Sequence, residues 1–178
     1  MSTPAYATPT DDQISWREAD HSSLLPPHLV AFLQGGVTVS LGARTAGGRP
    51  VIGVGVACRV TGSDELSVLV SREANRPLLE AVAAGSALAA TFSRARDHRS
   101  IQIKTSFASI QDIEFGDPSE AARQSALLAD DLMELGYSRL QAEAYAFRGA
   151  DDLVALAFRP ERVFTQTPGP GAGAELRR

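Results

Sequence analysis

Short segments in which apolar and polar residues alternate follow one another along the chain, separated by glycine, proline and small polar residues. Alternation with a period of two is typical of a strand with one buried face. It occurs first at 37–41 and 51–60, on either side of Gly47 and Gly48, a pair typical of a hairpin turn. The same pattern predicts strands at 66–70, 86–92, 152–158 and 162–164, and one long strand, bent midway, from Ser100 to Phe115.

Four other segments carry helix signals, namely proline in the first turn, a polar N-cap or a glycine after the end. They are 28–34 after a proline pair, 76–84 after Asn75, 117–135 after an Asp-Pro-x-Glu capping pattern, and 140–147 after Ser138. In the third, Leu128, Leu132 and Leu135 lie on one face, where they indicate core or dimer packing. Short strands interrupted by three or four helices predict a mainly β fold of the α+β class, a small antiparallel barrel with helices at its ends.

The length of 178 residues fits one domain. We expect a flexible arm over 1–23, because this segment is rich in serine, threonine, proline and aspartate without a sustained period. The folded domain is expected over 24–166, and an irregular tail over 167–178.

Composition removes several classes of function. The apolar runs are far shorter than the ~20 residues that span a bilayer, and no secretory segment is seen. We therefore expect a cytoplasmic protein that does not associate with a membrane. The net charge of −4 argues against a surface that binds nucleic acid. Cys58 is the only cysteine and lies in an apolar strand pattern, which predicts a buried, inert thiol and no metal cluster.

A basic segment, residues 71–77, lies between a predicted strand and a predicted helix. The first N–H groups of a helix are unpaired and lie at the positive end of its dipole, and arginine matches phosphate oxygens. The segment therefore suits an anion, although capped helices of this composition commonly bind nothing. Its polar candidates are Ser71, Arg72, Asn75 and Arg76.

A second polar group follows one face of the long strand, where Ser100, Gln102 and Lys104 are two residues apart. A row of hydroxyl, amide and ammonium donors can hold the edge of a flat ring such as a flavin, or can simply face solvent. Arg44 and Arg49 flank the glycine turn, where they add positive charge to a site or lie on an exposed hairpin. No residue stands out as a catalytic acid, base or nucleophile.

The order of these segments resembles the pyridoxamine 5′-phosphate oxidase-like FMN-binding split-barrel family. RSIQIK, residues 99–104, looks like the family's strand that begins with an arginine and a polar residue, and RPERVFTQTPGPGAG looks like the C-terminal region of its bacterial members. The match covers roughly residues 25–170, and the helices at 117–147 look like an insertion. The tryptophan and histidine of the true oxidases are absent from the C-terminus, which argues against vitamin B6 oxidation.

The resemblance implies a split antiparallel β-barrel that works as a homodimer, with FMN at the subunit interface and a small-molecule substrate. The phosphate would lie near the 71–76 turn, and the ring near the strands that hold Arg49, Val51 and Gly53 and residues 100–104. Gly53 and Gly55 would leave room for the ring or the partner subunit.

Three other functions stay open beside a flavin-dependent oxidoreductase. One is a flavin-binding or sensing module without turnover, and another is a deazaflavin-dependent reductase. Haem binding would need an axial ligand, and the histidines are His21, His28 and His98, of which His98 lies in a charged loop and is expected at the surface.

Overall fold

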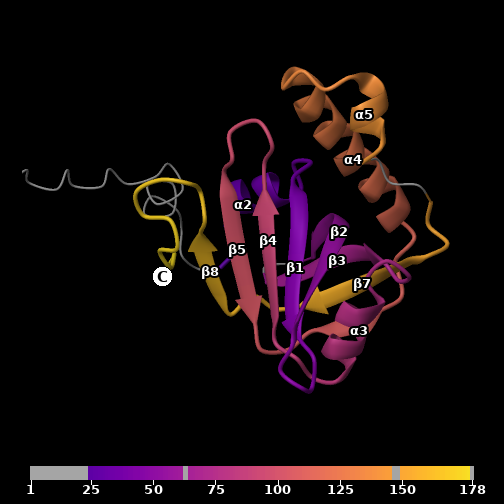
Figure 1. The fold of residues 1–178 in the computed structure, drawn as a ribbon, viewed down its shortest axis with the longest axis vertical. Helices are drawn as coiled ribbons and strands as arrows, with labels where there is room; N and C mark the ends of the chain where they lie inside the picture. The colour runs from indigo at the N-terminus through magenta and orange to yellow at the C-terminus, as the bar shows by residue number, and fades with distance from the viewer. Residues whose placement is uncertain (1–23, 62–63, 146–148, 177–178) are drawn as a thin grey trace, which may run out of the picture.

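The computed structural model describes residues 24–61, 64–145 and 149–176, and the predicted arm at 1–23 lies outside them. Within these residues the chain forms one eight-stranded sheet and four helices (Figure 1). The elements are α2 (Pro27–Leu33), β1 (Thr38–Arg44), β2 (Pro50–Thr61), β3 (Glu65–Ser71), α3 (Arg76–Ala83), β4 (Leu88–Ser93), β5 (Ser100–Thr105), β6 (Ser109–Gln111), α4 (Asp117–Glu134), α5 (Arg139–Glu143), β7 (Leu153–Phe158) and β8 (Arg162–Thr165).

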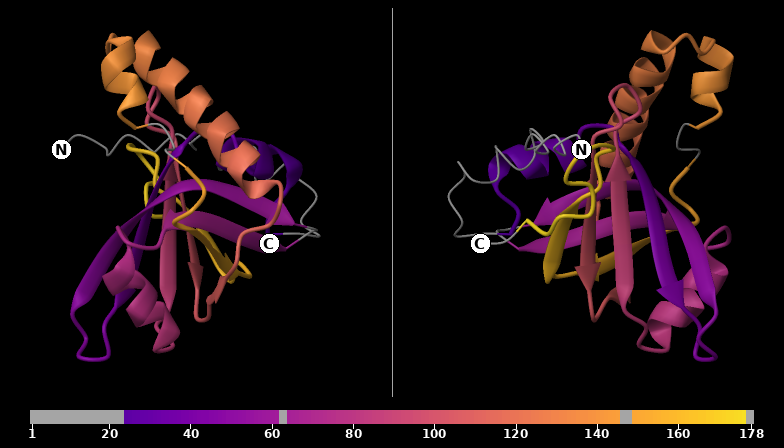
Figure 2. Two further views of the ribbon diagram at one scale, coloured as in Figure 1. Left: turned by 90° about the vertical axis from the view of Figure 1, so that its right-hand side faces the viewer. Right: turned by 60° about the vertical axis from the view of Figure 1, so that its left-hand side comes forward.

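All neighbouring strands are antiparallel, in the order β6-β7-β3-β2-β1-β4-β5-β8. The sheet curves so that β1, β4 and β5 face β2, β3 and β7 across the core, but β6 and β8 do not pair, so the barrel stays open (Figure 2). The apolar sides of α2 and α3, with Leu29, Leu33 and Leu78, pack against this core.

The 12-residue β2 is longer than its neighbours, and two amide side chains complete its hydrogen bonding. Asn75 accepts from the Val54 amide at 2.8 Å and donates to the Val54 carbonyl at 3.1 Å. Gln124 of α4 does the same for Cys58, at 3.1 and 2.6 Å. Because buried backbone groups must be paired, these two side chains fix α3 and α4 against β2.

Charged groups reinforce the contact between α4 and β2. The fully buried carboxylate of Asp117 accepts from Arg59 Nε at 2.8 Å and from the Glu114 amide at 2.8 Å. Arg123 binds Glu120 of the same helix and donates to the Gln34 carbonyl at 2.8 Å. The helix is thus anchored to the sheet and to the end of α2 at its N-terminal half.

The C-terminal half of α4 extends beyond the sheet, and α5 packs on it there (Figures 1 and 2). The predicted capping pair at the start of α5 is confirmed, because Ser138 accepts from the Gln141 amide and Gln141 accepts from the Ser138 amide. None of the described helices combines the length and the apolar composition needed to cross a membrane.

The predicted long bent strand is wrong. It is two strands, β5 and β6, separated by residues 106–108, and they pair with different partners. Phe107 and Phe115 had the parity of buried residues, but Phe107 lies in the break and Phe115 lies beyond the end of β6, and both side chains are exposed.

The predicted division of β2 into an apolar and a bare face is also wrong in part. A register irregularity between Gly55 and Ala57 changes which face is buried, so Ile52 and Val54 are exposed while Cys58 is buried. The bare side is not empty, because a Cβ on Gly53 would lie 2.4 Å from Asn75 Oδ1, and one on Gly55 would lie 2.6 Å from Val68 Cγ1. The room expected beside these glycines is therefore filled by the same chain.

The C-terminal segment, which was predicted to be an irregular tail, folds back along β8 and forms an isolated bridge between Glu175 and Phe164. The Leu176 amide donates to the Val163 carbonyl at 2.8 Å, and the Gly173 amide donates to the Thr165 carbonyl at 2.7 Å. Arg162 binds the Glu175 carboxylate at 2.7 Å, and the Leu176 side chain is buried in the core. This segment therefore covers the outer edge of β8.

Cys58 is buried, as predicted, and its thiol donates to the Leu33 carbonyl at 3.2 Å. Burial and the nearby Glu120 carboxylate raise the pKa of the Cys58 thiol well above its usual value. Because the thiolate is the reactive form, this environment keeps the residue unreactive.

Candidate functional site

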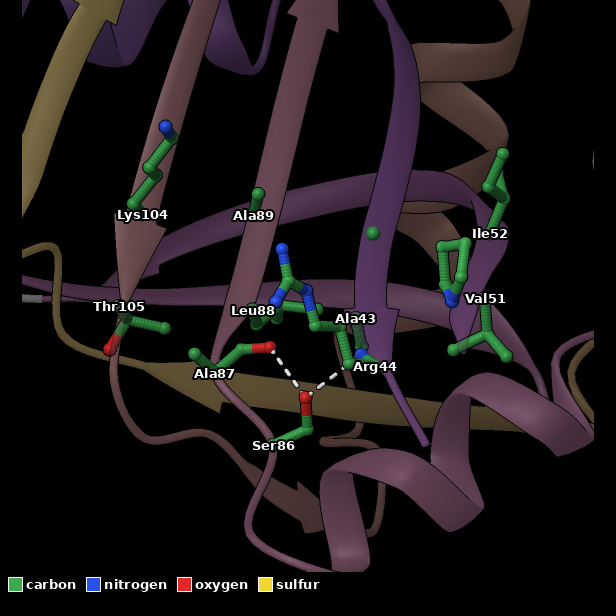
Figure 3. Close-up of a pocket in the computed structure, with 12 residues that line it drawn as sticks. Ala43, Arg44, Val51, Ile52, Ser86, Ala87, Leu88, Ala89, Lys104 and Thr105 are labelled. Carbon is green, nitrogen blue, oxygen red and sulfur yellow. Dashed lines mark hydrogen bonds between the residues drawn. The ribbon is translucent and has the colours of Figure 1, made fainter. Parts of the chain in front are cut away.

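A hollow of about 410 Å³ lies on the face of the sheet that points away from the core, near the β1–β2 hairpin (Figure 3). Its lining comes from the end of β1, the start of β2, the segment leading into β4 and the end of β5. The residues drawn in Figure 3 show its floor to be made of small side chains, with Ala87 and Ala89 beside β1. Openings of this size are typical of sites for small ligands.

The hollow follows from a row of residues that are register neighbours across five strands. Gly42 pairs with Ile52 on one side and with Ala89 on the other, and Ala89 pairs with Lys104, which pairs with Arg162. We call these five residues the hollow row. Because strands lie about 4.8 Å apart, Ile52 and Lys104 are separated by roughly 14 Å, with a shallow floor of glycine and alanine between them. A flat ring system can lie on such a floor.

A second row lies next to the first and is more polar. Ser40 pairs with Val54 and with Thr91, Thr91 pairs with Gln102, and Gln102 pairs with Phe164. The Gln102 amide donates to the Thr91 hydroxyl at 3.0 Å. Gln102 therefore lies beside the hollow row on the same face, while part of its hydrogen-bonding capacity is used within the sheet.

Positive charge borders the hollow on two sides. Among the described residues, no carboxylate forms an ion pair with Arg44 or Lys104. The Arg44 amide is held by the Ser86 hydroxyl at 3.0 Å, which orients the end of β1. Two unpaired cations beside an apolar floor suit a flat molecule that carries negative charge.

Lys104 is held by an aromatic contact rather than by a carboxylate. Its ammonium lies 4.6 Å from the centre of the Phe164 ring, and the Arg162 guanidinium lies 4.8 Å from the same ring. Glu175 neutralises Arg162 but not its register partner Lys104. The ring thus fixes two like charges side by side and leaves the charge of Lys104 available on the outer face.

Ser100, the third member of the predicted polar row, is used within the protein. Its hydroxyl donates to the His98 carbonyl at 3.0 Å and bonds the Ser93 hydroxyl at 2.8 Å, and its side chain is largely buried. His98 itself is exposed and has a φ of 58°, so it lies in the surface loop where the sequence placed it.

The basic turn before α3 already holds a carboxylate from elsewhere in the chain. Asp152, just before β7, accepts from the Ser71 hydroxyl and from the Glu73 amide, the latter at 3.2 Å to each oxygen. Its carbonyl accepts from the Arg72 amide at 2.7 Å. Asp152 therefore occupies the Ser71 hydroxyl and the backbone amides of Arg72 and Glu73.

The remaining residues of the turn divide into one structural and two exposed side chains. Asn75 is buried and uses its amide on Val54 and on the Ser71 carbonyl, so it anchors α3 and does not cap it. Arg72 and Arg76 are exposed and form no ion pair with a described residue. The turn therefore offers two guanidinium groups beside an occupied set of amides.

The structure brings some of the predicted site residues together and leaves others apart. Val51 and Lys104 line the hollow, and Gln102 lies on the next row. Arg49 is exposed in the hairpin turn, and Gly53 faces α3. The lining also includes residues that the sequence reasoning did not select; they are Gly42, Ser86, Ala87, Ala89 and Thr105. The signal that could have found the floor is the presence of glycine and alanine at outward positions of β1 and β4.

Comparison with known proteins gives information on the fold. No protein-family model matches the chain, and no curated protein matches it. Among solved structures, HupZ of Group A Streptococcus aligns over 82% of this chain and 98% of its own, with 14% identity and a TM-score of 0.51. This likeness shows the fold and carries no statement about activity.

Two further similar structures score lower. A putative pyridoxamine 5′-phosphate oxidase of Lactobacillus delbrueckii covers 92% of this chain and 99% of its own, at 14% identity and a TM-score of 0.44. HutZ of Vibrio cholerae, described as a heme storage protein, aligns over 80% of this chain and 96% of its own, with 15% identity and a TM-score of 0.46. The similar structures thus include a putative pyridoxamine 5′-phosphate oxidase, as the resemblance predicted. The described residues and the likeness to HupZ confirm the α+β fold, with an antiparallel sheet that remains open.

Proposed function

We propose that this chain is an FMN-binding protein, working as a homodimeric flavin-dependent oxidoreductase on a small-molecule substrate. The observation that carries the proposal is the hollow, whose floor of Gly42 and Ala89 is bordered by Arg44 and Lys104. The residues fit the group, because the floor accepts a planar ring, and the cations complement both the phosphate and the anionic reduced ring.

FMN, when bound, supplies hydride or single-electron transfer, and the protein supplies position and electrostatics. Lys104 and Gln102 provide donors along one side of the floor, and the apolar side chain of Ile52 borders the other. The turn at 71–76 lies on the far side of β2 from this floor, where Asn75 contacts Val54. A cofactor whose phosphate reaches that turn would pass around the edge of β2.

The first test is the absorbance spectrum of the purified protein, followed by fluorescence titration with FMN. We expect flavin bands and saturable binding, and we expect Ala89→Phe to weaken FMN affinity at least tenfold because it fills the floor. Ala122→Phe, on the exposed part of α4, is the control and should bind like wild type. A colourless protein with no FMN affinity would remove the proposal.

The same preparation separates the rival cofactors. Mass spectrometry of the released ligand distinguishes FMN from a deazaflavin. A Soret band on haem titration would show that the protein binds haem and would make haem the proposed cofactor in place of flavin. Stopped-flow reduction with NADH or NADPH then tests turnover. Saturable FMN binding without reduction by either donor would make the chain a flavin-binding module and not an oxidoreductase.

The homodimer is proposed from the exposed apolar side chains beside the hollow. Ile52 is 80% exposed and Val54 is 63% exposed, and both lie on the outer face next to the open side of the site. A second copy packed on this face would cover them and exclude water from the cofactor. The hollow alone covers only one face of a ring.

Substitutions of Ile52 and Leu140 form a matched pair that tests this face. Leu140 lies on α5, away from the hollow, and is 80% exposed like Ile52. Ile52→Glu should convert the dimer to a monomer and lower FMN affinity, whereas Leu140→Glu should leave both unchanged. Light scattering after size-exclusion chromatography measures the mass. A dimer that survives Ile52→Glu but not Leu140→Glu would place the interface on α5.

A further inference from the structure

The α4–α5 hairpin carries apolar surface that the core of the sheet does not use. The C-terminal half of α4 extends beyond the sheet and packs against α5 (Figures 1 and 2). Four large apolar side chains of this region are between 47% and 80% exposed, namely Leu135, Tyr137, Leu140 and Tyr145. Exposed apolar side chains that gather in one region are typical of a contact with another molecule.

A groove of about 290 Å³ lies between the two helices. Its lining from α4 includes a row of small or flexible side chains that recur at intervals of three and four residues and so share one side of the helix, Ala122, Ala126, Ala129 and Met133. Ala142 lines it from α5. Since a helix rises 1.5 Å per residue, the row spans roughly 16 Å, or about three turns. A second helix can therefore lie close along α4.

The part of the hairpin beyond the sheet is acidic. Residues 126–145 hold four carboxylates, Asp130, Asp131, Glu134 and Glu143, and one arginine, Arg139, which gives a net charge of −3. Arg96, in the loop between β4 and β5, offsets part of this charge, because it pairs with Asp131 and Glu134. The last carbonyl groups of α4 add partial negative charge at the same end.

Negative charge also borders the groove itself. Asp130 lines it from α4, is exposed, and forms no ion pair with any residue that the structure describes. Glu143 lines it from α5, and its carboxylate lies 3.6 Å from the Arg139 guanidinium. An apolar floor with acidic borders is complementary to an apolar stripe flanked by lysine or arginine.

We propose that the α4–α5 groove is a docking surface for a basic amphipathic helix of another protein. The apolar stripe of this helix lies on the alanine row, and its basic side chains lie toward Asp130 and Glu143, as in other complexes that hold a helix in a groove. None of the described residues lines both the groove and the hollow, so this surface is independent of the proposed cofactor site.

The charge of the chain argues against its own segments as the occupant. Residues 1–23 hold four carboxylates and one arginine, a net charge of −3, and the hairpin of a second copy is as acidic as the first. Like charges placed opposite each other destabilise a contact. The partner is therefore a different, positively charged chain, and an anionic lipid surface is disfavoured for the same reason.

The probe for this surface is a helical peptide of about 18 residues of leucine and lysine, with leucine at i, i+3, i+4 and i+7. Isothermal titration calorimetry should show saturable binding. Ala126→Phe fills the groove and Asp130→Lys reverses the charge at its border, so each should weaken binding at least tenfold. The matched controls Ala83→Phe and Glu80→Lys, at exposed positions of α3, should stay within twofold of wild type.

Two further measurements give the place and the specificity of binding. The peptide should shift the amide resonances of residues 122–133 and 139–143 in ¹⁵N-labelled protein. A peptide of the same composition with its leucine stripe scrambled should bind at least tenfold more weakly. Circular dichroism checks that each variant is folded, and Asp130→Lys, which changes an exposed side chain, keeps the test valid if Ala126→Phe does not fold.

Several outcomes would overturn the inference. They are no saturable binding of the leucine–lysine peptide, equal binding of the scrambled peptide, and equal weakening by Asp130→Lys and Glu80→Lys, which would assign the effect to overall charge. A lower mass of Ala126→Phe in light scattering would make a second copy the occupant. Binding of wild type, but not of Ala126→Phe, to vesicles of phosphatidylcholine and phosphatidylglycerol would make it a lipid surface. FMN titration of the same variants tests the proposed function separately, because neither groove substitution touches the hollow.

Discussion

The cations of this protein are used in two contrasting ways. Where α4 meets β2, Arg59 and Arg123 are each bound to a carboxylate, through Asp117 and Glu120. Around the hollow, Arg44 and Lys104 have no carboxylate partner among the described residues. The first pair holds two elements together, whereas the second leaves its charge on the outer face. The pairing of a cation, and not its presence, is what separates a structural role from a candidate binding role here.

The largest effect is expected from breaking the buried pair at α4. Asp117→Ala leaves Arg59 without its buried partner and the Glu114 amide without an acceptor, so the free energy of unfolding should fall by about 3 kcal/mol. Urea denaturation followed by circular dichroism measures this. Glu114→Ala is the control, because Glu114 also pairs with Arg59 but is 66% exposed, and it should cost less than about 1 kcal/mol. Equal losses would mean that burial does not decide the strength of this network.

At the hollow the expectation is reversed, with ligand affinity affected and stability unchanged. Arg44→Gln and Lys104→Gln should each weaken FMN binding about tenfold, which corresponds to about 1.4 kcal/mol. Both should change the free energy of unfolding by less than about 0.5 kcal/mol. Fluorescence titration and urea denaturation provide the two measurements. A loss of stability without a loss of affinity would assign these cations to the fold.

The smallest effect is expected at Glu120, and it depends on pH. Hydrogen bonding from Arg123 lowers the pKa of Glu120 to about 2, with help from Gln124 and Gln34 and against partial burial. Since the unfolded pKa is 4.5, this stabilisation is complete above pH 4.5 and is lost as the pH falls toward 2.

Glu120→Gln should therefore reduce the free energy of unfolding by about 1 kcal/mol at pH 7 and by less at pH 3. Thermal unfolding across this range measures the difference. The control Glu80→Gln, on the exposed side of α3, should follow wild type at every pH. A constant difference between Glu120→Gln and wild type would show that charge is not the cause.

Periodicity predicted most elements of the fold, because strands such as β1 and β4 bury alternate residues and each helix has its own start signal. The first hairpin, the helix after Asn75 and the capping pair at Ser138 all appear where expected. The break between β5 and β6 could not be predicted, since alternation continues through it and only the change of partner strand separates the two. The register irregularity in β2 is likewise set by its neighbours.

The candidate site was predicted less well than the fold. Lys104 and Gln102 were found because polar side chains two residues apart on a strand share one face. The floor of the hollow was missed, because Gly42 and Ala89 carry no chemistry and become neighbours only when β1 pairs with β4. The partner of the basic turn, Asp152, is more than 70 residues distant from it in the chain, and nothing in the local sequence connects the two.

The return of the C-terminal segment along β8 has a practical consequence for any shortened form of this protein. Residues 173–176 occupy hydrogen-bonding groups of β8 and insert Leu176 into the core. A chain that ends before Gly173 would present an unpaired strand edge beside an apolar hole, a combination that recruits strands from other molecules. Such a truncation should polymerise or precipitate on concentration.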